Sequence, residues 1–210
     1  MKNLLLVLGL ILSVSSYSQD LVTIKHANYT TTFSKSLEYP VVVEWWETKS
    51  KDACPIPLKR KDQFQADPQL LKESDLMKDY VGSGTDRGHM CPAASNLCSG
   101  DKVQTECFYF TNMSPQYHSL NAGDWKSLET LTRTMAVEKD SIHVWCGNVG
   151  VAKKIGKVSV PTKCWKVIYI KQTKEFRAYI FNNDTSKPNG IEDNKVTLQS
   201  VEKLTGLKFN

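Results

Sequence analysis

The sequence lacks the long apolar runs, repeats and linkers that would indicate a membrane protein or a chain of several domains. Its longest apolar stretch runs from Leu4 to Val14, about eleven of the 210 residues, whereas a helix that spans a bilayer needs roughly 20. It contains no low-complexity tract and no internal repeat. These absences argue against a membrane-spanning anchor and predict one domain behind the apolar stretch.

The first 18 residues have the pattern of a secretory signal peptide. Lys2 supplies the positive start, and Ser16 and Ser18 are small residues at the two positions that a signal peptidase reads. No cysteine directly follows this region, so a lipoprotein anchor is not expected. The sequence predicts a signal peptide over residues 1–18, cleavage after Ser18 or Gln19, and a domain over residues 19–210 that is secreted or periplasmic.

The chain also lacks any Cys-x-x-Cys spacing, although it has six cysteines. In an exported chain these predict disulfides, for which 15 full pairings exist. Cys146 and Cys164 lie in two strand-like runs joined by a hairpin-type loop, and they form the predicted pair; the other pairings stay open. A zinc site is the weaker alternative. It would use His89, Cys91, Cys98 and Cys107.

The distribution of residue types predicts an α+β fold with a central antiparallel β-sheet flanked by helices. Runs of β-branched and aromatic residues predict strands over residues 41–46, 108–111, 142–149, 164–171 and 176–181. Helical signals run from Asp67-Pro68 toward Asp79, over residues 122–138, and over residues 196–204 with a stop at Gly206.

Positive charge is concentrated in one part of the sequence. Loss of Lys2 leaves 26 basic against 22 acidic residues, a mild net charge of +4. Between Val144 and Ile180, however, eight basic residues stand against Glu175 alone, a local net charge of +7. The eight are Lys153, Lys154, Lys157, Lys163, Lys166, Lys171, Lys174 and Arg177. Such a patch attracts phosphate backbones of any sequence; a solvated lysine-rich face is the alternative.

A compact motif, Asp86-Arg87-Gly88-His89-Met90, places a cation, a glycine and a histidine side by side. Gly88 permits a backbone conformation that a side chain would forbid. The planar guanidinium of Arg87 fits phosphate oxygens, and His89 can accept a proton near neutral pH. The motif predicts a general base beside a positive site of the size of a phosphate.

A second group of residues follows about thirty positions later and comprises Asn112–Gln116, Asn121, Trp125 and Glu129. With both groups, the chain resembles the DNA/RNA non-specific endonucleases that carry the Asp-Arg-Gly-His motif, within the ββα-metal (His-Me finger) superfamily. The resemblance covers nearly the whole chain behind the signal peptide. Further matches are Arg60, Phe64, Asp67-Pro68, Ser83-Gly84, Pro92, Pro161, Trp165-Lys166, Asn182 and Val201–Leu207.

The resemblance implies an active site of ββα-metal type centred on three residues. His89 is the general base that takes a proton from water, and Asn121 is the only direct protein ligand to a Mg²⁺ ion. Glu129 lies close to the metal and holds a coordinated water. Mn²⁺ or another divalent cation could replace Mg²⁺. Without the resemblance, Glu129 would be interpreted as the i,i+4 ion-pair partner of Arg133.

The resemblance also assigns residues that bind the phosphate and residues that shape the site. Arg60 and Arg87 balance the charge that builds up on the phosphoryl oxygens, so both are catalytic and substrate-binding residues. Lys166 is a further phosphate-binding residue. Asp86 and Gly88 have structural roles, and Asp86 hydrogen-bonds the loop that presents the base.

The chain has only four histidines. His26 lies near the mature N-terminus and His143 lies within a strand pattern, so both are expected to be structural or surface residues. His118 is three residues from Asn121 and is the weaker candidate for the site. His89, inside the motif, is the predicted base.

The implied activity is hydrolysis of phosphodiester bonds in DNA and RNA, in which one Mg²⁺ stabilises the leaving group and the products carry 5′ phosphates. No segment indicates a protein partner. Two residues depart from the family's common pattern: Thr85 stands where an aromatic residue is frequent, and Cys91 stands where alanine is usual. Cys91 is a candidate half of a disulfide that stiffens the motif loop. Neither change removes a chemical role.

Two other classes of protein were weighed against this interpretation. One is a secreted nucleic-acid-binding module of the same fold without catalysis, which the intact Arg87, His89 and Asn121 disfavour. The other is an extracellular recognition protein for carbohydrate or another acidic polymer that uses the five tryptophans. Trp125 and Trp165 are explained better as helix and sheet core.

Overall fold

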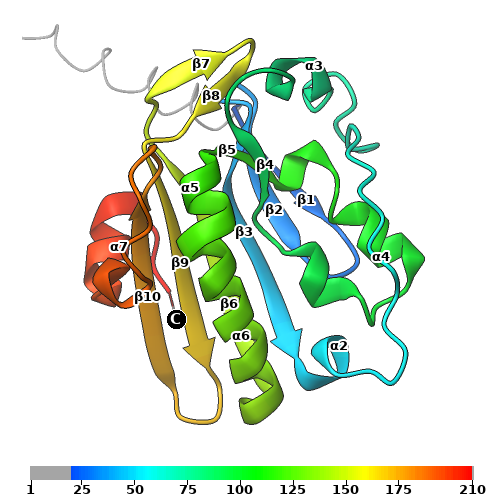
Figure 1. Cartoon of the computed structure of the whole chain (residues 1–210), viewed down its shortest axis with the longest axis vertical. Helices are drawn as coiled ribbons and strands as arrows, with labels where there is room; N and C mark the ends of the chain where they lie inside the picture. The colour runs from blue at the N-terminus through cyan, green and yellow to red at the C-terminus, as the bar shows by residue number, and fades with distance from the viewer. Residues whose placement is uncertain (1–19, 210) are drawn as a thin grey trace, which may run out of the picture.

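The computed structural model describes residues 20–209, and its main feature is a seven-stranded antiparallel sheet (Figure 1). The strand order is β1-β2-β3-β6-β9-β10-β11. Their bounds are Leu21–Lys25, Thr30–Ser34, Tyr39–Thr48, Ser141–Val149, Lys163–Ile170, Glu175–Asn182 and Lys195–Val196. The predicted signal peptide lies outside the described residues. The α+β fold with a central antiparallel sheet is confirmed.

Four of the predicted strands form the long central part of the sheet, as β3, β6, β9 and β10. They are rich in β-branched and aromatic residues, which fill both buried faces of a sheet covered on its two sides. Sequence patterning missed β1 and β2, because β2 is Thr-Thr-Thr-Phe-Ser and carries little apolar signal.

The two longest helices lie on opposite faces of this sheet. Helix α6, Lys126–Lys139, runs along one face, where Leu128 and Ala136 belong to the same buried cluster as Ile142 and Val144 (Figure 1). Helix α7, Leu198–Thr205, covers the other face through Val201. It ends at Gly206 as predicted, where φ is 74°, a left-handed conformation that glycine adopts without strain.

Shorter elements are inserted between these strands and helices. Two small sheets pair β4 (Asp86–His89) with β5 (Met113–Gln116), and β7 (Lys153–Ile155) with β8 (Val158–Val160). The short helices are α2 Lys49–Asp52, α3 Met77–Tyr80, α4 Asp101–Glu106 and α5 His118–Leu120. The remaining helical turns are η1 Ala93–Asn96, η2 Phe110–Asn112, η3 Asn121–Trp125 and η4 Glu192–Asn194. No helix among residues 20–209 has the length and apolar character of a membrane span.

Two predicted elements are wrong. Residues 108–111 form a loop that enters the 3₁₀ turn η2 instead of a strand. The helix expected from Asp67 toward Asp79 is reduced to turns and the four-residue α3. The Asp67 carboxylate accepts the Gln69 N–H at 2.9 Å, as an N-cap would. Its other oxygen is bound by buried His26 at 3.0 Å and by Thr111 at 2.6 Å, which fastens this segment to other parts of the chain.

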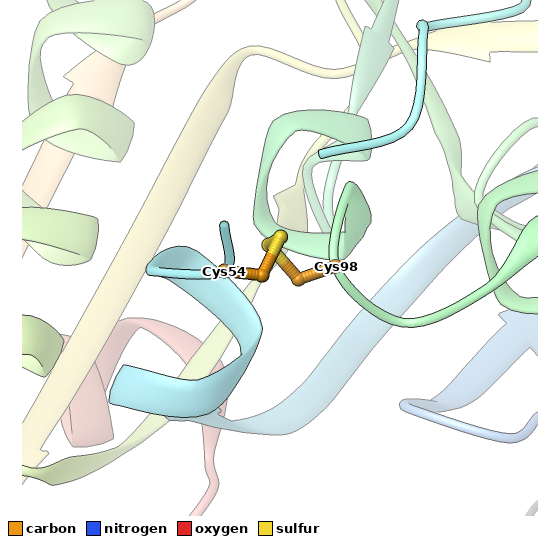
Figure 2. The surroundings of a disulfide bond; sticks show 2 residues. All are labelled: Cys54 and Cys98. Atoms are coloured by element: carbon orange, nitrogen blue, oxygen red, sulfur yellow. A yellow bond between two sulfur atoms is a disulfide. The ribbon is translucent and has the colours of Figure 1, made fainter. Parts of the chain in front are cut away.

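One disulfide joins Cys54, just after α2, to Cys98, in the loop after η1 (Figure 2). Cys98 is therefore not available to the alternative zinc site with His89. Cys91 and Cys107 are buried free thiols, so the disulfide suggested for Cys91 is not present.

The predicted pairing of Cys146 with Cys164 is wrong, because both are buried free thiols. The two strands are neighbours, as expected, but their register places Cys146 opposite Lys166 and Cys164 opposite Asn148. The two cysteines are therefore diagonal to each other, a register that the sequence does not reveal.

Removing the Cys54–Cys98 bond is expected to lower the free energy of unfolding by about 4 kcal/mol, because the bond closes a loop with a sequence separation of 44. The variant Cys54→Ala/Cys98→Ala should unfold at lower denaturant concentration than the parent. The reduced parent should behave like the variant. Equal unfolding midpoints for the oxidised parent and the variant would contradict this expectation.

Candidate active site

The residues of the Asp-Arg-Gly-His motif form strand β4, which pairs antiparallel with β5. In this register Gly88 lies opposite Ser114, and His89 lies opposite Met113. A β-carbon on Gly88 would collide with the side chain of buried Gln116, so only glycine fits there. Strand β5 leads through α5 and η3 into α6. This arrangement is the predicted ββα motif.

His89 is 8% exposed and lies beside two aromatic rings that also contact each other. Its ring centroid is 5.6 Å from that of Phe64 and 5.0 Å from that of Phe108. The Trp125 indole N–H donates to the His89 carbonyl at 3.0 Å, while Nε2 of the imidazole has no hydrogen-bond partner. The fold thus fixes the residue through its backbone and leaves Nε2 able to accept a proton.

Burial and two neighbouring cations keep the His89 imidazole neutral. Burial lowers the pKa of His89 to about 3, and the positive charges of Arg60 and Arg87 act in the same direction. The negative charge of Asp62 acts in the opposite direction. At neutral pH the ring therefore carries no proton on one of its nitrogens.

The same two aromatic rings support the two predicted phosphate-binding arginines. The Arg87 guanidinium lies 4.3 Å from the centroid of Phe64, and that of Arg60 lies 5.4 Å from the centroid of Phe108. Arg60 also donates to Asp62 at 2.8 Å. Cation–π contacts of this kind hold an arginine while leaving its N–H groups free for phosphate.

A cleft of about 500 Å³ brings four of the predicted residues together. Its lining consists of Arg60, Asp62, Phe64, Tyr80, Val81, Gly82, Thr85, Asp86, Arg87 and Asn121. His89 is not part of this lining, but Phe64, which is, contacts both His89 and Arg87. Two cations therefore line the surface hollow, and the neutral imidazole is buried against Phe64 in its wall.

Asn121 is held at the cleft by Asp86. Its Nδ2 donates to Asp86 Oδ2 at 2.8 Å, and the same oxygen contacts Nδ1 of the exposed His118 at 2.8 Å. With the amide nitrogen bound to a carboxylate, Oδ1 of Asn121 remains as a neutral oxygen donor of the type that Mg²⁺ accepts. The residues present therefore fit a divalent cation. Asn121 and Asp86 lie 35 residues apart in the sequence, so the sequence pattern did not predict this contact.

No group of three or more His, Cys, Asp or Glu side chains that could hold a metal ion occurs among residues 20–209. Glu129 lies in the first turn of α6. Burial raises its pKa above the ordinary value, and the charges of Lys166, Arg133 and Arg60 oppose that rise. Glu129 is therefore close to Arg60 and to the Trp125 indole, and it has no ion pair with Arg133 within the described chain.

The placement of Lys166 does not agree with a role in binding phosphate from solution. Lys166 is fully buried between α6 and the sheet, with its Nζ 4.1 Å from the Trp125 ring centroid and without a hydrogen-bond partner. Its ammonium acts on Glu129 instead. Strand β9 carries apolar, buried side chains on both of its faces. The sequence therefore did not reveal which face of the strand residue 166 occupies.

The lysine-rich region of the sequence is divided between the two ends of the molecule. Figure 1 shows the β7–β8 hairpin, which carries Lys153 and Lys154, at one end, and the β9–β10 connection, which carries Lys171 and Lys174, at the other. Lys153 Nζ lies 5.3 Å from the ring of Tyr117, which directly precedes α5. Only the first group lies beside the β5–α5 segment that leads to the cleft.

The antiparallel sheet, the β4–β5–α6 motif, the neutral histidine and the two arginines at the cleft together have the arrangement of a ββα-type site. The chain belongs to the DNA/RNA non-specific endonuclease family, whose model matches residues 10–210.

Nucleases from distant organisms are similar to this chain. It is 35% identical over 169 residues to Nuclease C1 of Cunninghamella echinulata var. echinulata, which covers 70% of the chain and 66% of that protein. It is 28% identical over 207 residues to the Nuclease of Serratia marcescens. This match covers 90% of the chain and 75% of that protein. The chain is 32% identical over 170 residues to human mitochondrial Nuclease EXOG. The match covers 70% of the chain and 46% of that protein, so the chain spans about half the length of that relative.

A solved structure has the same fold. The crystal structure of the EndoG/EndoGI complex superimposes on this chain with a TM-score of 0.79 at 26% sequence identity. The match covers 89% of this chain and 84% of that one.

Proposed function

We propose that this protein is an exported, metal-dependent endonuclease that hydrolyses DNA and RNA without sequence preference. The observation that carries the proposal is the buried, neutral His89, whose Nε2 has no partner and whose neighbour Phe64 lines a cleft with two arginines and Asn121. No described element resembles a recognition helix for base edges, while cations that meet phosphates are present.

The reaction follows from the placement of these side chains. Arg60 and Arg87 bind the non-bridging oxygens of the phosphate and orient it in the cleft. His89 Nε2 accepts a proton from the attacking water. A phosphate bound between the arginines offsets their charge, so the pKa of His89 rises as substrate binds and the base becomes stronger when it is needed. The departing group is the 3′ oxygen, and the products carry 5′ phosphates.

A divalent cation held at Asn121, Mg²⁺ or Mn²⁺, would supply positive charge next to the phosphate and the leaving oxygen. Asn121 and, through water, Glu129 are the residues that would hold it. A general base alone contributes about 10²–10⁴-fold, whereas enzymes typically reach 10⁶–10¹⁷-fold. The arginines, the cation and the orientation of the substrate are needed for the remainder.

Export is proposed from the pattern of residues 1–18 and is supported by the Cys54–Cys98 disulfide, because disulfides persist in oxidising compartments. The domain of residues 19–210 would be secreted or periplasmic. Detection of the cleaved chain outside the cytoplasm, beginning at Gln19 or Asp20, tests this assignment.

The purified mature protein is expected to degrade plasmid DNA, single-stranded DNA and RNA to short products, and a chelator should stop all three reactions. End-labelling should find 5′ phosphates. Binding without cleavage would favour the alternative of an inactive nucleic-acid-binding module. Cleavage at one short DNA sequence only would contradict the proposed lack of specificity.

The β7–β8 hairpin is expected to make cleavage sensitive to salt, because lysines beside the cleft release counterions when they meet phosphates. Replacing Lys153, Lys154 and Lys157 by Ala should flatten the fall of kcat/KM with rising salt. The matched control is Lys171→Ala/Lys174→Ala, at the opposite end of the molecule. Equal salt slopes for the parent and the triple variant would show that the hairpin does not meet substrate.

A further inference from the structure

The chain after β10 returns along the segment that carries Asn121. We call residues 183–194 the strap. At its start, Asn183 accepts the Tyr117 N–H through Oδ1 at 2.9 Å and donates through Nδ2 to the carbonyls of Pro115 and Pro161, each at 2.9 Å. The Ser119 hydroxyl then donates to the carbonyl of Asp184 at 2.7 Å. The strap is thus fastened to β5 and α5 just before Asn121.

The second attachment of the strap is the carboxylate of Asp124, which lies in the same turn as Asn121. Asp124 is 8% exposed. It accepts the backbone N–H groups of Asn189 and Gly190, both at 3.2 Å, and Nδ2 of Asn194 at 3.3 Å. Asn194 also donates to the Gly190 carbonyl at 2.8 Å, which closes the end of the strap. A buried carboxylate that accepts several N–H groups is a rigid anchor.

A third contact explains why the turn departs from a regular helix. Gly123 has φ −97° and ψ −113°, outside the helical region, and α6 begins only at Lys126 for this reason. The ring of Pro188 occupies the position that a side chain on Gly123 would need. The helix predicted over residues 122–138 therefore starts late, because a proline of the strap packs against the kinked backbone.

We propose that the strap positions Asn121, and that Asp124 is the positioning residue through which it acts. Asn121 is held on one side by Asp86, which binds its amide nitrogen. The backbone that carries it is held on the other side by Asp124 and Gly123. Together these contacts fix the direction of Oδ1 toward the cleft, so the strap sets the affinity for the divalent cation. This inference rests on the proposed function, which places the cation at Asn121.

The test compares two changes made from opposite sides of the contact. Asp124→Asn keeps the size of the side chain but turns an N–H donor toward the N–H groups of the strap, and Asn194→Ala removes one donor without changing any charge. Each variant should bind Mn²⁺ at least ~10-fold more weakly in calorimetry without substrate, as is typical when a group that orients a metal ligand is lost. Because both act through one contact, the double variant should be little worse than the stronger single variant.

The matched control is Asp193→Asn, which removes an exposed carboxylate one residue from Asn194 that has no recorded partner among the described residues. It should bind Mn²⁺ like the parent. That result would show that the loss of negative charge by itself does not weaken Mn²⁺ binding, so the effect of Asp124→Asn comes from the lost contact with the strap. Circular dichroism confirms the fold, and if Asp124→Asn fails to fold, Asn194→Ala decides.

The outcomes separate the two proposals. If the parent binds Mn²⁺ and folded Asn194→Ala binds it equally well, the strap does not position Asn121 and the proposed function stands. If Asp193→Asn is as weak as Asp124→Asn, charge alone explains the effect and the positioning role is overturned. If the parent binds no Mn²⁺, the metal site fails and this inference fails with it.

Discussion

His89→Ala is expected to lower kcat by at least ~10²-fold, because it removes the neutral imidazole whose neighbour Phe64 lines the cleft with the two arginines. Binding of DNA and of Mg²⁺ should persist, since Arg60, Arg87 and Asn121 remain in place. Added imidazole should restore part of the cleavage, because the cavity left beside the Phe64 and Phe108 rings has the size of the missing ring. Single-turnover cleavage of a labelled oligonucleotide, with saturating enzyme, measures the chemical step directly.

His143→Ala provides the matched control. His143 is a partly buried histidine that also contacts an aromatic ring, with its centroid 4.6 Å from that of Trp46, and burial likewise lowers its pKa, to about 4. It lies in β6, outside the β4–β5–α6 motif, and should retain parent activity. If folded His89→Ala cleaves at a rate close to that of the parent, the mechanism is wrong.

The low pKa of His89 also predicts how stability depends on pH. The folded-state pKa of about 3 lies below the value of about 6.5 in the unfolded chain, so between these values the unfolded state binds more protons. The contribution of His89 is therefore fully present above pH about 6.5 and is lost as the pH falls toward 3. His89→Ala should be less sensitive to acid than the parent in denaturant titrations across this window.

Asn121→Ala is expected to weaken divalent-cation binding at least ~10-fold, since it removes the oxygen donor itself and not merely a group that orients it. Activity should fall with the affinity and recover partly at high Mg²⁺, in contrast to His89→Ala, which excess metal cannot rescue. The measurement is a Mg²⁺ titration of cleavage for both variants. Asn28→Ala, which loses a partly buried hydrogen bond to Asn96 at 2.9 Å away from the lining of the cleft, is the control. An unchanged Mg²⁺ dependence would refute the ligand assignment while leaving the base intact.

The sequence predicts well those parts of the fold that depend on residue type over long runs. The strands rich in Val, Ile and Trp, helix α6 and the end of α7 at Gly206 are examples. It does not predict β4 and β5 as strands, since Asp-Arg-Gly-His and Met-Ser-Pro-Gln have neither alternation nor β-branched residues. They pair because the tertiary structure brings them together. The site could be predicted only from the Asp-Arg-Gly-His motif, and not from the pattern of apolar residues.

For the site, the sequence predicts which residues take part better than it predicts the surroundings of each side chain. Arg60, Arg87, Asp86 and Asn121 line one cleft, as their assigned roles require. Lys166, in contrast, points into the core, because one position of register in a doubly buried strand decides which face a side chain occupies. The strap was missed because its contacts are specific hydrogen bonds made by a loop, which leave no periodic trace in a sequence.

The Cys54–Cys98 bond also bears on resistance to proteolysis. Cys54 and Cys98 enclose the stretch that supplies Arg60, Arg87 and His89, and this stretch includes Ile56, which is 87% exposed. A protease that cuts the exposed part of this stretch leaves two fragments that remain covalently joined, so the base and both arginines stay on the molecule. Such a nicked chain would migrate as one species until a reductant is added, and the bond would then protect the enzyme against digestion as well as against unfolding.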